Sequence, residues 1–141
     1  MISSERYIEL HARSAFSFLR GAATPEELIA VCSELNMPAM ALLDNDGVYG
    51  AARFHLAAQK VGIQAHIGAE ITVRNQTSDV RGQKAESRRL KAERNVVRTF
   101  VLPLLIRNRT GYQNLCRLFT LMKMRVPKHA KPGECAVTLD E

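Results

Sequence analysis

The sequence lacks the cysteine patterns of disulfide-rich and zinc-ribbon proteins. Its three cysteines, Cys32, Cys116 and Cys135, are odd in number and far apart, and no two of them form a C-x-x-C pair. We therefore expect neither a disulfide framework nor a zinc ribbon, and a reducing, cytoplasmic compartment is the one that fits.

Long apolar runs are also missing. The first six residues contain no apolar signal core, and the longest aliphatic run, residues 101–106, is far shorter than the roughly 20 residues that a membrane helix needs. The sequence therefore predicts neither secretion nor a membrane partner.

The composition is that of one globular domain, or of part of one. The chain has 141 residues, of which 46% are hydrophobic and 24% charged, enough to bury a moderate core. Twenty Lys and Arg against fourteen Asp and Glu give a net charge of +6 and a pI near 9.6. This balance suits a polyanionic partner such as nucleic acid, but it fits an inert basic surface equally well.

Strand-type runs alternate with helix-type segments, which predicts an α/β fold. The expected strands cover residues 7–10, 39–43, 63–73 and 99–106, and the third is expected to break at Gly68. Because helices separate the first three strands, we expect these to run parallel with right-handed crossovers. Pro103 lacks a backbone N–H, so the fourth strand should lie at an edge or contain a bulge.

Capping signals mark three helices. Thr24, followed by Pro25 and Glu27, predicts the first helix, Gly62 should end the second, and Thr110 should begin the third. Helical spacing predicts the buried faces of the first and third helices, respectively Leu28, Val31, Cys32 and Leu35, and Leu115, Leu118, Phe119 and Met122.

Three segments between these elements carry further expectations. Residues 74–95 contain seven Lys or Arg against three Asp or Glu and almost no large apolar residue, which predicts an exposed loop. Residues 14–21 should turn Phe16, Phe18 and Leu19 toward a core. Residues 138–141 resemble the start of a helix, so the native chain is expected to continue.

Polar side chains follow three of the predicted strands. His11 and Arg13 come after the first, Asp44 after the second and Glu70 near the end of the third. Carboxyl ends of strands are where α/β barrels hold their reactive groups, so we expect these side chains over one face. A His-x-His pair would bind a metal, but Arg13 cannot. Taken singly, His11 also fits an ordinary hydrogen-bonded histidine and Asp44 an Asx turn.

Three long stretches of sequence resemble one family. Residues 7–28, 39–50 and 68–70 are similar to the N-terminal PHP (polymerase and histidinol phosphatase) domain of bacterial DNA polymerase III alpha subunits. Residues 111–123 and 131–140 resemble the error-prone, lesion-bypass branch of that family in particular. The resemblance covers nearly the whole chain apart from residues 74–95.

The resemblance implies a fold and a ligand set. PHP domains are distorted barrels of seven βα units that bind up to three metal ions. Residues 1–141 would be the N-terminal part of such a barrel, truncated to about four strands and three helices. His11, Asp44 and Glu70 match ligand positions of the family, whereas Arg13 and Asn45 stand where histidines are expected.

These replacements favour a structural role over catalysis. We expect no catalytic residue and at most weak zinc or manganese binding, with Arg13 pairing with Asp44 or Glu70 in place of an ion. The parent error-prone polymerase would use magnesium in a palm domain absent here, in DNA replication and repair of damage. Its partners would be DNA and other lesion-bypass or replication proteins, and the open sheet edges favour self-association.

Two other functions remain open from the sequence. A metal-dependent phosphoesterase or proofreading 3′-exonuclease would use His11, Asp44 and Glu70 to hold a metal-bound hydroxide. A free-standing interaction domain descended from the polymerase module would differ only in whether the gene continues past Glu141.

Overall fold

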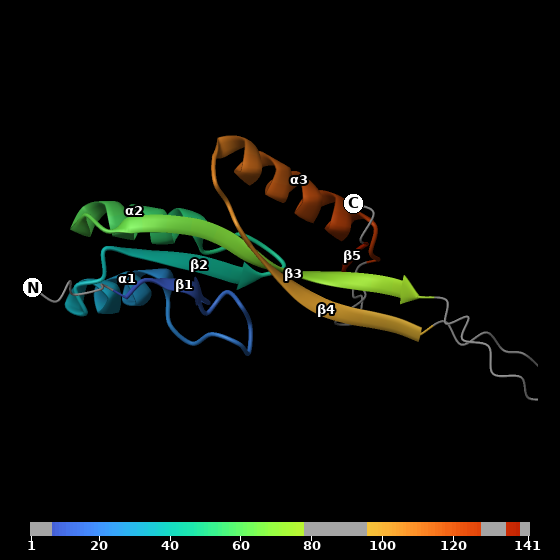
Figure 1. Cartoon of the computed structure of the whole chain (residues 1–141), viewed down its shortest axis with the longest axis horizontal. Helices are drawn as coiled ribbons and strands as arrows, with labels where there is room; N and C mark the ends of the chain where they lie inside the picture. Colours follow the sequence, from blue (N-terminus) through green and yellow to red (C-terminus); the bar gives the residue numbers. More distant parts are fainter. Residues whose placement is uncertain (1–6, 78–95, 128–134, 139–141) are drawn as a thin grey trace, which may run out of the picture.

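The computed structural model describes residues 7–77, 96–127 and 135–138, which build one sheet with helices packed against it (Figure 1). Its strands are β1 (Glu9–Ala12), β2 (Ala39–Asn45), β3 (Gln64–Thr77), β4 (Val96–Leu105) and the short β5 (Val137–Thr138). Its helices are α1 (Pro25–Glu34), α2 (Ala51–Val61) and α3 (Arg109–Met124). The expected α/β class, with about four strands and three helices in a curled partial barrel, is confirmed.

The sheet has the strand order β1-β2-β3-β4, with β5 beside β3. The first three strands run parallel, as predicted, and α1 and α2 connect them. β4 runs antiparallel to β3, from the pair Gly68 and Leu105 to the pair Thr77 and Val96. Figure 1 shows that this two-stranded ribbon extends well beyond the ends of β1 and β2.

The expected break of the third strand at Gly68 is wrong. β3 passes through Gly68 without interruption, and a Cβ there would lie 2.2 Å from the carbonyl oxygen of Leu104. Glycine at this position therefore marks a close approach of β4 and not a strand end. β3 also continues to Thr77, into the first four residues of the loop expected at 74–95; residues 78–95 lie outside the described part of the chain.

Pro103 occupies the position that the sequence predicted for it. The N–H of Ile106 donates to the carbonyl of Ile67 on β3 (2.9 Å), so alternation along the strand turns the nitrogen of residue 103 away from β3. β4 is an edge strand among the described residues. The missing N–H of Pro103 therefore costs the β3–β4 ladder nothing.

The helix termini follow the capping signals in two cases of three. Thr24 caps α1 in a reciprocal capping box with Glu27, and Gly62 ends α2 at a φ of 74°. α3 begins earlier than predicted, because the Asn108 side chain accepts a hydrogen bond from the N–H of Gly111 (2.9 Å) and is the N-cap instead of Thr110.

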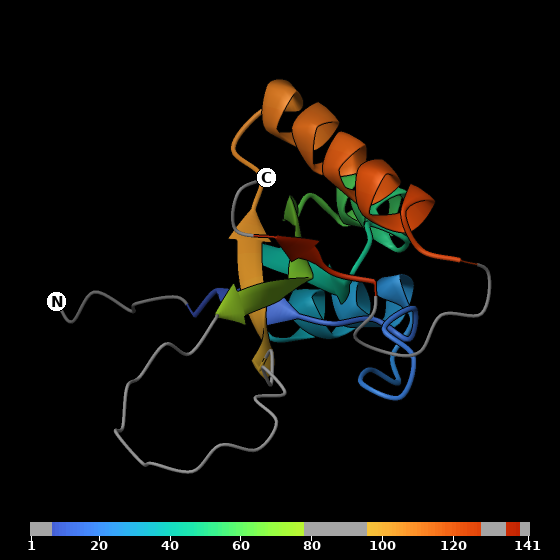
Figure 2. The same ribbon diagram turned by 90° about the vertical axis from the view of Figure 1, so that its right-hand side faces the viewer.

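All three helices pack on one face of the sheet. Ala65 and Ile67 of β3 contact the apolar cluster of α1 and α2, whereas Ala69, Ile71 and Val73 contact that of α3. These residues alternate along one continuous strand and so share a face. In Figure 2 the helices follow one another along the sheet, from α3 at the top to α1 below. The opposite face carries Glu70 and Thr72.

The predicted core residues are correct for α3 and only partly correct for α1. α3 buries Leu115, Phe119 and Met122, as predicted, with Leu118 packed at the margin. α1 instead buries a face rotated from the expected one, composed of Pro25, Ile29 and Cys32, and leaves Val31 and Leu35 exposed.

The loop after β1 also differs from expectation. Phe16, Phe18 and Leu19 do not enter the core; Phe18 and Leu19 are 82% and 89% exposed. Ser14 and Ser17 are buried in their place. Within the described residues, no helix has the length and apolar character needed to cross a bilayer.

The close approach of β4 at Gly68 makes a stability prediction. Gly68→Ala should lower the free energy of unfolding by about 2–3 kcal/mol, because the new methyl group meets a backbone carbonyl that cannot move aside cheaply. Urea unfolding followed by circular dichroism measures this change. Gly111→Ala is the matched control: its Cβ would meet no atom closer than 3.5 Å, so it should raise stability by about 0.5–1 kcal/mol. Equal losses in the two variants would contradict the role assigned to Gly68.

Candidate functional site

Glu70 is the centre of a charged cluster on the helix-free face of the sheet. Its side chain is only 2% exposed, yet both carboxylate oxygens are hydrogen-bonded. Arg13 donates from Nε to Oε2 (2.8 Å) and from Nη2 to Oε1, and His11 Nε2 donates to Oε1 (2.5 Å). His11 and Arg13 point the same way, as predicted from their spacing, and their common target is Glu70.

The hydrogen bonds of this cluster stabilise the ionised forms of Glu70 and Arg13. Burial by itself raises the pKa of Glu70, but the hydrogen bonds from Arg13 and then His11 outweigh it, so this pKa lies below its ordinary value of 4.5. The pKa of Arg13 is raised, chiefly by its hydrogen bond to Glu70. At neutral pH the cluster is therefore a carboxylate held by a guanidinium in a bidentate pair.

Asp44 lies on the other face of the sheet. It pairs in register with Ala69, whereas its neighbour Asn45 pairs with Glu70. Residues 40 and 42 of β2 pack against the helices, so alternation directs Asp44 to the helix side. The three candidate ligands were expected over one face, and this expectation fails for Asp44.

The Asp44 carboxylate holds two loops in place. Oδ1 accepts hydrogen bonds from the Ser14 N–H (2.9 Å) and the Ser17 hydroxyl (2.8 Å), and Oδ2 accepts one from the Gly50 N–H (3.1 Å). The Ser14 hydroxyl also contacts both oxygens (2.8 and 3.0 Å). Asp44, 1% exposed, thus ties the loop after β1 to the start of α2.

Asp46 likewise holds a loop in place, by hydrogen bonds to β3 beside Glu70. Its carboxylate accepts hydrogen bonds from the backbone N–H and the hydroxyl of Thr72 (2.7 and 2.9 Å), and its own N–H donates to the Glu70 carbonyl (2.7 Å). Asn45 donates from Nδ2 to Asp46 (2.8 Å). The turn after β2 is therefore fastened to β3 at Glu70 and Thr72.

The donor set does not fit the metal centre that the family resemblance implies. His11 and Glu70 meet, but Asp44 is on the opposite face, and protein donors already engage both carboxylates. Arg13 supplies no ligand in place of the expected histidine, and Asn45 offers an amide oxygen, buried and without a hydrogen-bond partner, in place of an imidazole nitrogen. Among the described residues, no three His, Cys, Asp or Glu side chains are arranged to hold one ion.

Sequence reasoning missed Ser14, Ser17 and Gly50 as parts of this region. A Cβ on Gly50 would lie 2.8 Å from Asp44 Oδ2 and 3.1 Å from the Ser14 hydroxyl, so only glycine lets the start of α2 approach the carboxylate. Phe16 and Phe18 of this loop led to the prediction of a core contact that does not form. Two serines three residues apart, close after a strand, were the available signal.

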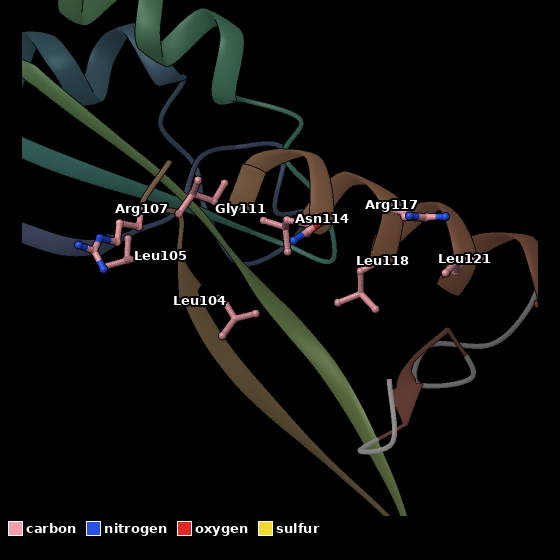
Figure 3. A pocket seen from close by; sticks show the side chains of 10 residues that line it. Leu104, Leu105, Arg107, Gly111, Asn114, Arg117, Leu118 and Leu121 are labelled. Carbon is pink, nitrogen blue, oxygen red and sulfur yellow. The ribbon is translucent and has the colours of Figure 1, made fainter. Parts of the chain in front are cut away.

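A hollow of about 560 Å³ lies between β4 and α3 and is not lined by any residue of the Glu70 or Asp44 clusters (Figure 3). Its lining is mostly aliphatic, and Figure 3 shows Leu118 directed from α3 toward the strands. The lining includes two arginines, Arg107 and Arg117, but no acid, His or Cys. Size alone therefore does not make it a reaction site.

The cluster at Glu70 makes a stability prediction. Arg13→Met should lower the free energy of unfolding at pH 7 by about 1–2 kcal/mol, because it leaves a buried carboxylate with only His11 as partner. This value is reduced from that of a fully buried pair, because the Arg13 side chain is 35% exposed and solvent screens it. Adding Glu70→Gln to Arg13→Met should recover part of the loss.

Arg53 provides a matched control. It pairs with Glu26 through the same two guanidinium nitrogens (2.7 and 2.8 Å), but both side chains are about half exposed. Arg53→Met should therefore cost clearly less than Arg13→Met. Urea midpoints of the variants, measured in one buffer, decide this, and equal shifts would contradict the importance given to Glu70.

The same cluster sets a pH dependence. Because the pKa of Glu70 is lower in the folded chain than the ordinary 4.5, its ionised form stabilises the fold at higher pH. This contribution is complete above the unfolded pKa and is lost as the pH falls through the folded pKa. Wild-type protein should therefore lose more stability between pH 6 and acid pH than Glu70→Gln, in thermal melts over that range. Parallel pH profiles would show that Glu70 is not held ionised.

Ser17 tests the contacts of Asp44. Ser17→Ala removes the hydroxyl that donates to Asp44 and accepts from the Asn45 N–H (3.0 Å), and should cost about 1–3 kcal/mol. Ser33→Ala, on the exposed side of α1, should change stability little. Urea unfolding of both variants provides the comparison. If Ser17→Ala costs no more stability than Ser33→Ala, the hydrogen bond of Ser17 to Asp44 does not hold the loop in place.

Comparison with solved structures supports the fold. A protein from Bifidobacterium adolescentis, provisionally assigned as a metal-dependent phosphoesterase, superposes with a TM-score of 0.57 at 18% identity, over 85% of this chain and 34% of that one. An amidohydrolase from Chromobacterium violaceum, solved with sulfate and no metal, gives a TM-score of 0.50 at 25% identity, over 84% of this chain and 34% of that one. At this identity the first of these likenesses concerns the fold alone.

Sequence comparison is more specific. An error-prone DNA polymerase from Anaeromyxobacter sp. is 38% identical over 120 residues, which are 85% of this chain and 9% of that protein. One from Mycolicibacterium paratuberculosis is 51% identical over 71 residues, 50% of this chain and 6% of that protein. The chain therefore spans about a tenth of the length of these relatives. The sequence profile of the PHP domain matches residues 9–137, and the chain belongs to the PHP domain family.

Proposed function

We propose that this chain is the N-terminal PHP module of an error-prone DNA polymerase, and that it serves as a structural element without a metal centre of its own. The observation that carries this proposal is the bidentate pair of Arg13 with the buried Glu70. A positive charge is needed there, because a buried carboxylate without a counter-charge is costly. In this proposal the guanidinium supplies it.

The kinship with error-prone polymerases supports the polymerase part of the proposal. The matching relatives carry that name, and the PHP profile covers residues 9–137 of this chain. The parent would copy damaged DNA with magnesium ions held outside this module, during replication and repair. The module alone is not expected to extend a primer, since it contributes about a tenth of such a protein.

Arg13 also explains why a metal would bind poorly. A divalent ion at Glu70 would have to displace two N–H donors from the carboxylate and then lie beside a fixed positive charge. Of the three candidate ligands, only His11 and Glu70 lie on that face, fewer than a stable site needs. The charge of Arg13 and the loss of ligands therefore act in the same direction.

Metal analysis tests the proposal. Protein purified from medium with added zinc and manganese should contain far less than one ion per chain, and its melting temperature should not change with EDTA. A variant that combines Arg13→His and Asn45→His restores the residue types that the family expects and serves as the comparison. Stoichiometric zinc or manganese in the wild-type chain would refute the proposal that the module has no metal centre of its own.

Turnover tests the competing function. A metal-dependent phosphoesterase or 3′-exonuclease would hydrolyse p-nitrophenyl phosphate or shorten a labelled DNA strand when manganese is added. We expect neither activity above background. Manganese-stimulated turnover in the wild-type chain that disappears in both His11→Gln and Glu70→Gln would establish the enzymatic function instead.

A further inference from the structure

The charges are segregated between the two longer described parts of the chain. Residues 7–77 contain five Lys or Arg and seven Asp or Glu, a net charge of −2. Residues 96–127, which form β4, α3 and their flanks, contain six Lys or Arg and no acid, a net charge of +6. A general solubilising surface would mix both signs, so this separation requires a different explanation.

Part of this positive charge lies on a defined side of α3. The buried residues Leu115, Phe119 and Met122 set the inward direction of the helix. Arg109, Gln113 and Arg117 follow one another at intervals of four residues, and all three are exposed. At about 100° per residue they form a stripe on the side opposite the buried face. We call these three residues the α3 stripe.

The chemistry of the α3 stripe matches a phosphate backbone. Arg109 and Arg117 are separated by roughly 12 Å along the helix axis, and Gln113 places an additional amide donor between them. Nucleic acid carries one charge per ~3.4 Å of axis on each strand, so this length faces several phosphates. Arginine binds phosphate oxygens through paired N–H groups, which makes it better suited to this task than lysine.

We propose that the α3 stripe is a contact surface for the phosphate backbone of DNA. Leu121 and Met124 are also exposed (45% and 79%) and neighbour the stripe on α3, so an acidic amphipathic helix is the competing partner, which the competition experiment below distinguishes from DNA. The proposal rests on the proposed function, because kinship with polymerases is what makes DNA the expected polyanion. It adds that this module itself touches DNA, on an element separate from the Glu70 cluster.

Salt-dependent binding tests the proposal. Fluorescence anisotropy with a labelled duplex, and separately with a single strand, measures affinity between about 50 and 200 mM salt. Replacing two phosphate contacts with Arg109→Gln and Arg117→Gln should reduce the magnitude of the slope of log K against log salt by about 1.8 on duplex and about 1.4 on single-stranded DNA. A reduction of the slope on only one of these probes identifies the form of DNA that the stripe contacts.

The control removes the same charge elsewhere. Arg20→Gln with Lys60→Gln also takes away two exposed positive side chains, but from the loop after β1 and from α2. This pair should leave the slope nearly unchanged. All four substitutions are at exposed positions, and circular dichroism should show that each variant is folded before its affinity is measured. Equal slopes for wild type and the α3 variant, or equal losses in both variants, would overturn the proposal.

Two further results separate the explanations. Poly-glutamate that competes as well as DNA at equal charge would overturn the proposal in favour of an acidic protein partner. A chain that binds no DNA at 50 mM salt would also overturn it, but would leave the metal analysis and hence the proposed function untouched. Competition by DNA alone, together with the reduced slope, would support it.

Discussion

The structure depends on keeping one buried carboxylate ionised. Glu70 lies on a central strand with almost no contact with solvent, where an unpaired charge would cost far more than the fold could tolerate. Arg13 and His11 come from the β1 edge of the sheet, reach across β2 and hydrogen-bond to both of its oxygens. Since Arg13 follows β1 directly, the same contact also fixes how the end of β1 lies over the sheet. Electrostatics and chain path are therefore linked at this point.

The buried carboxylates on the two faces of the sheet have different roles. On the helix side, Asp44 accepts hydrogen bonds from neutral groups only and organises loops. On the open side, Glu70 has a cationic partner that reaches solvent. A single residue of register separates these roles, because Asp44 and Asn45 are consecutive on β2 and point in opposite directions. Sequence neighbours can thus belong to chemically unrelated sites.

Sequence reasoning predicted the elements better than their contacts. Capping at Thr24, the stop at Gly62 and the edge position of Pro103 depend on local backbone chemistry, which the sequence carries directly. Gly68 was misread because its reason is a carbonyl of β4, more than thirty residues away. The common face expected for His11 and Glu70 was correct, while Asp44 failed because strand ends alone do not reveal which face a side chain takes. Its partners Ser14 and Ser17 lie on a loop whose path local signals do not determine.

A guanidinium and a metal ion are not equivalent solutions for Glu70. Both neutralise the carboxylate, but an ion also accepts electron pairs and can activate water, whereas a guanidinium only donates hydrogen bonds. It is also covalently attached, so its charge does not depend on the supply of metal. In the function proposed for this module, that exchange keeps the stabilising charge and gives up the chemistry. Lysine at this position would keep the charge but not the paired N–H donors of the bidentate contact, so the geometry of Arg13 matters as well as its charge.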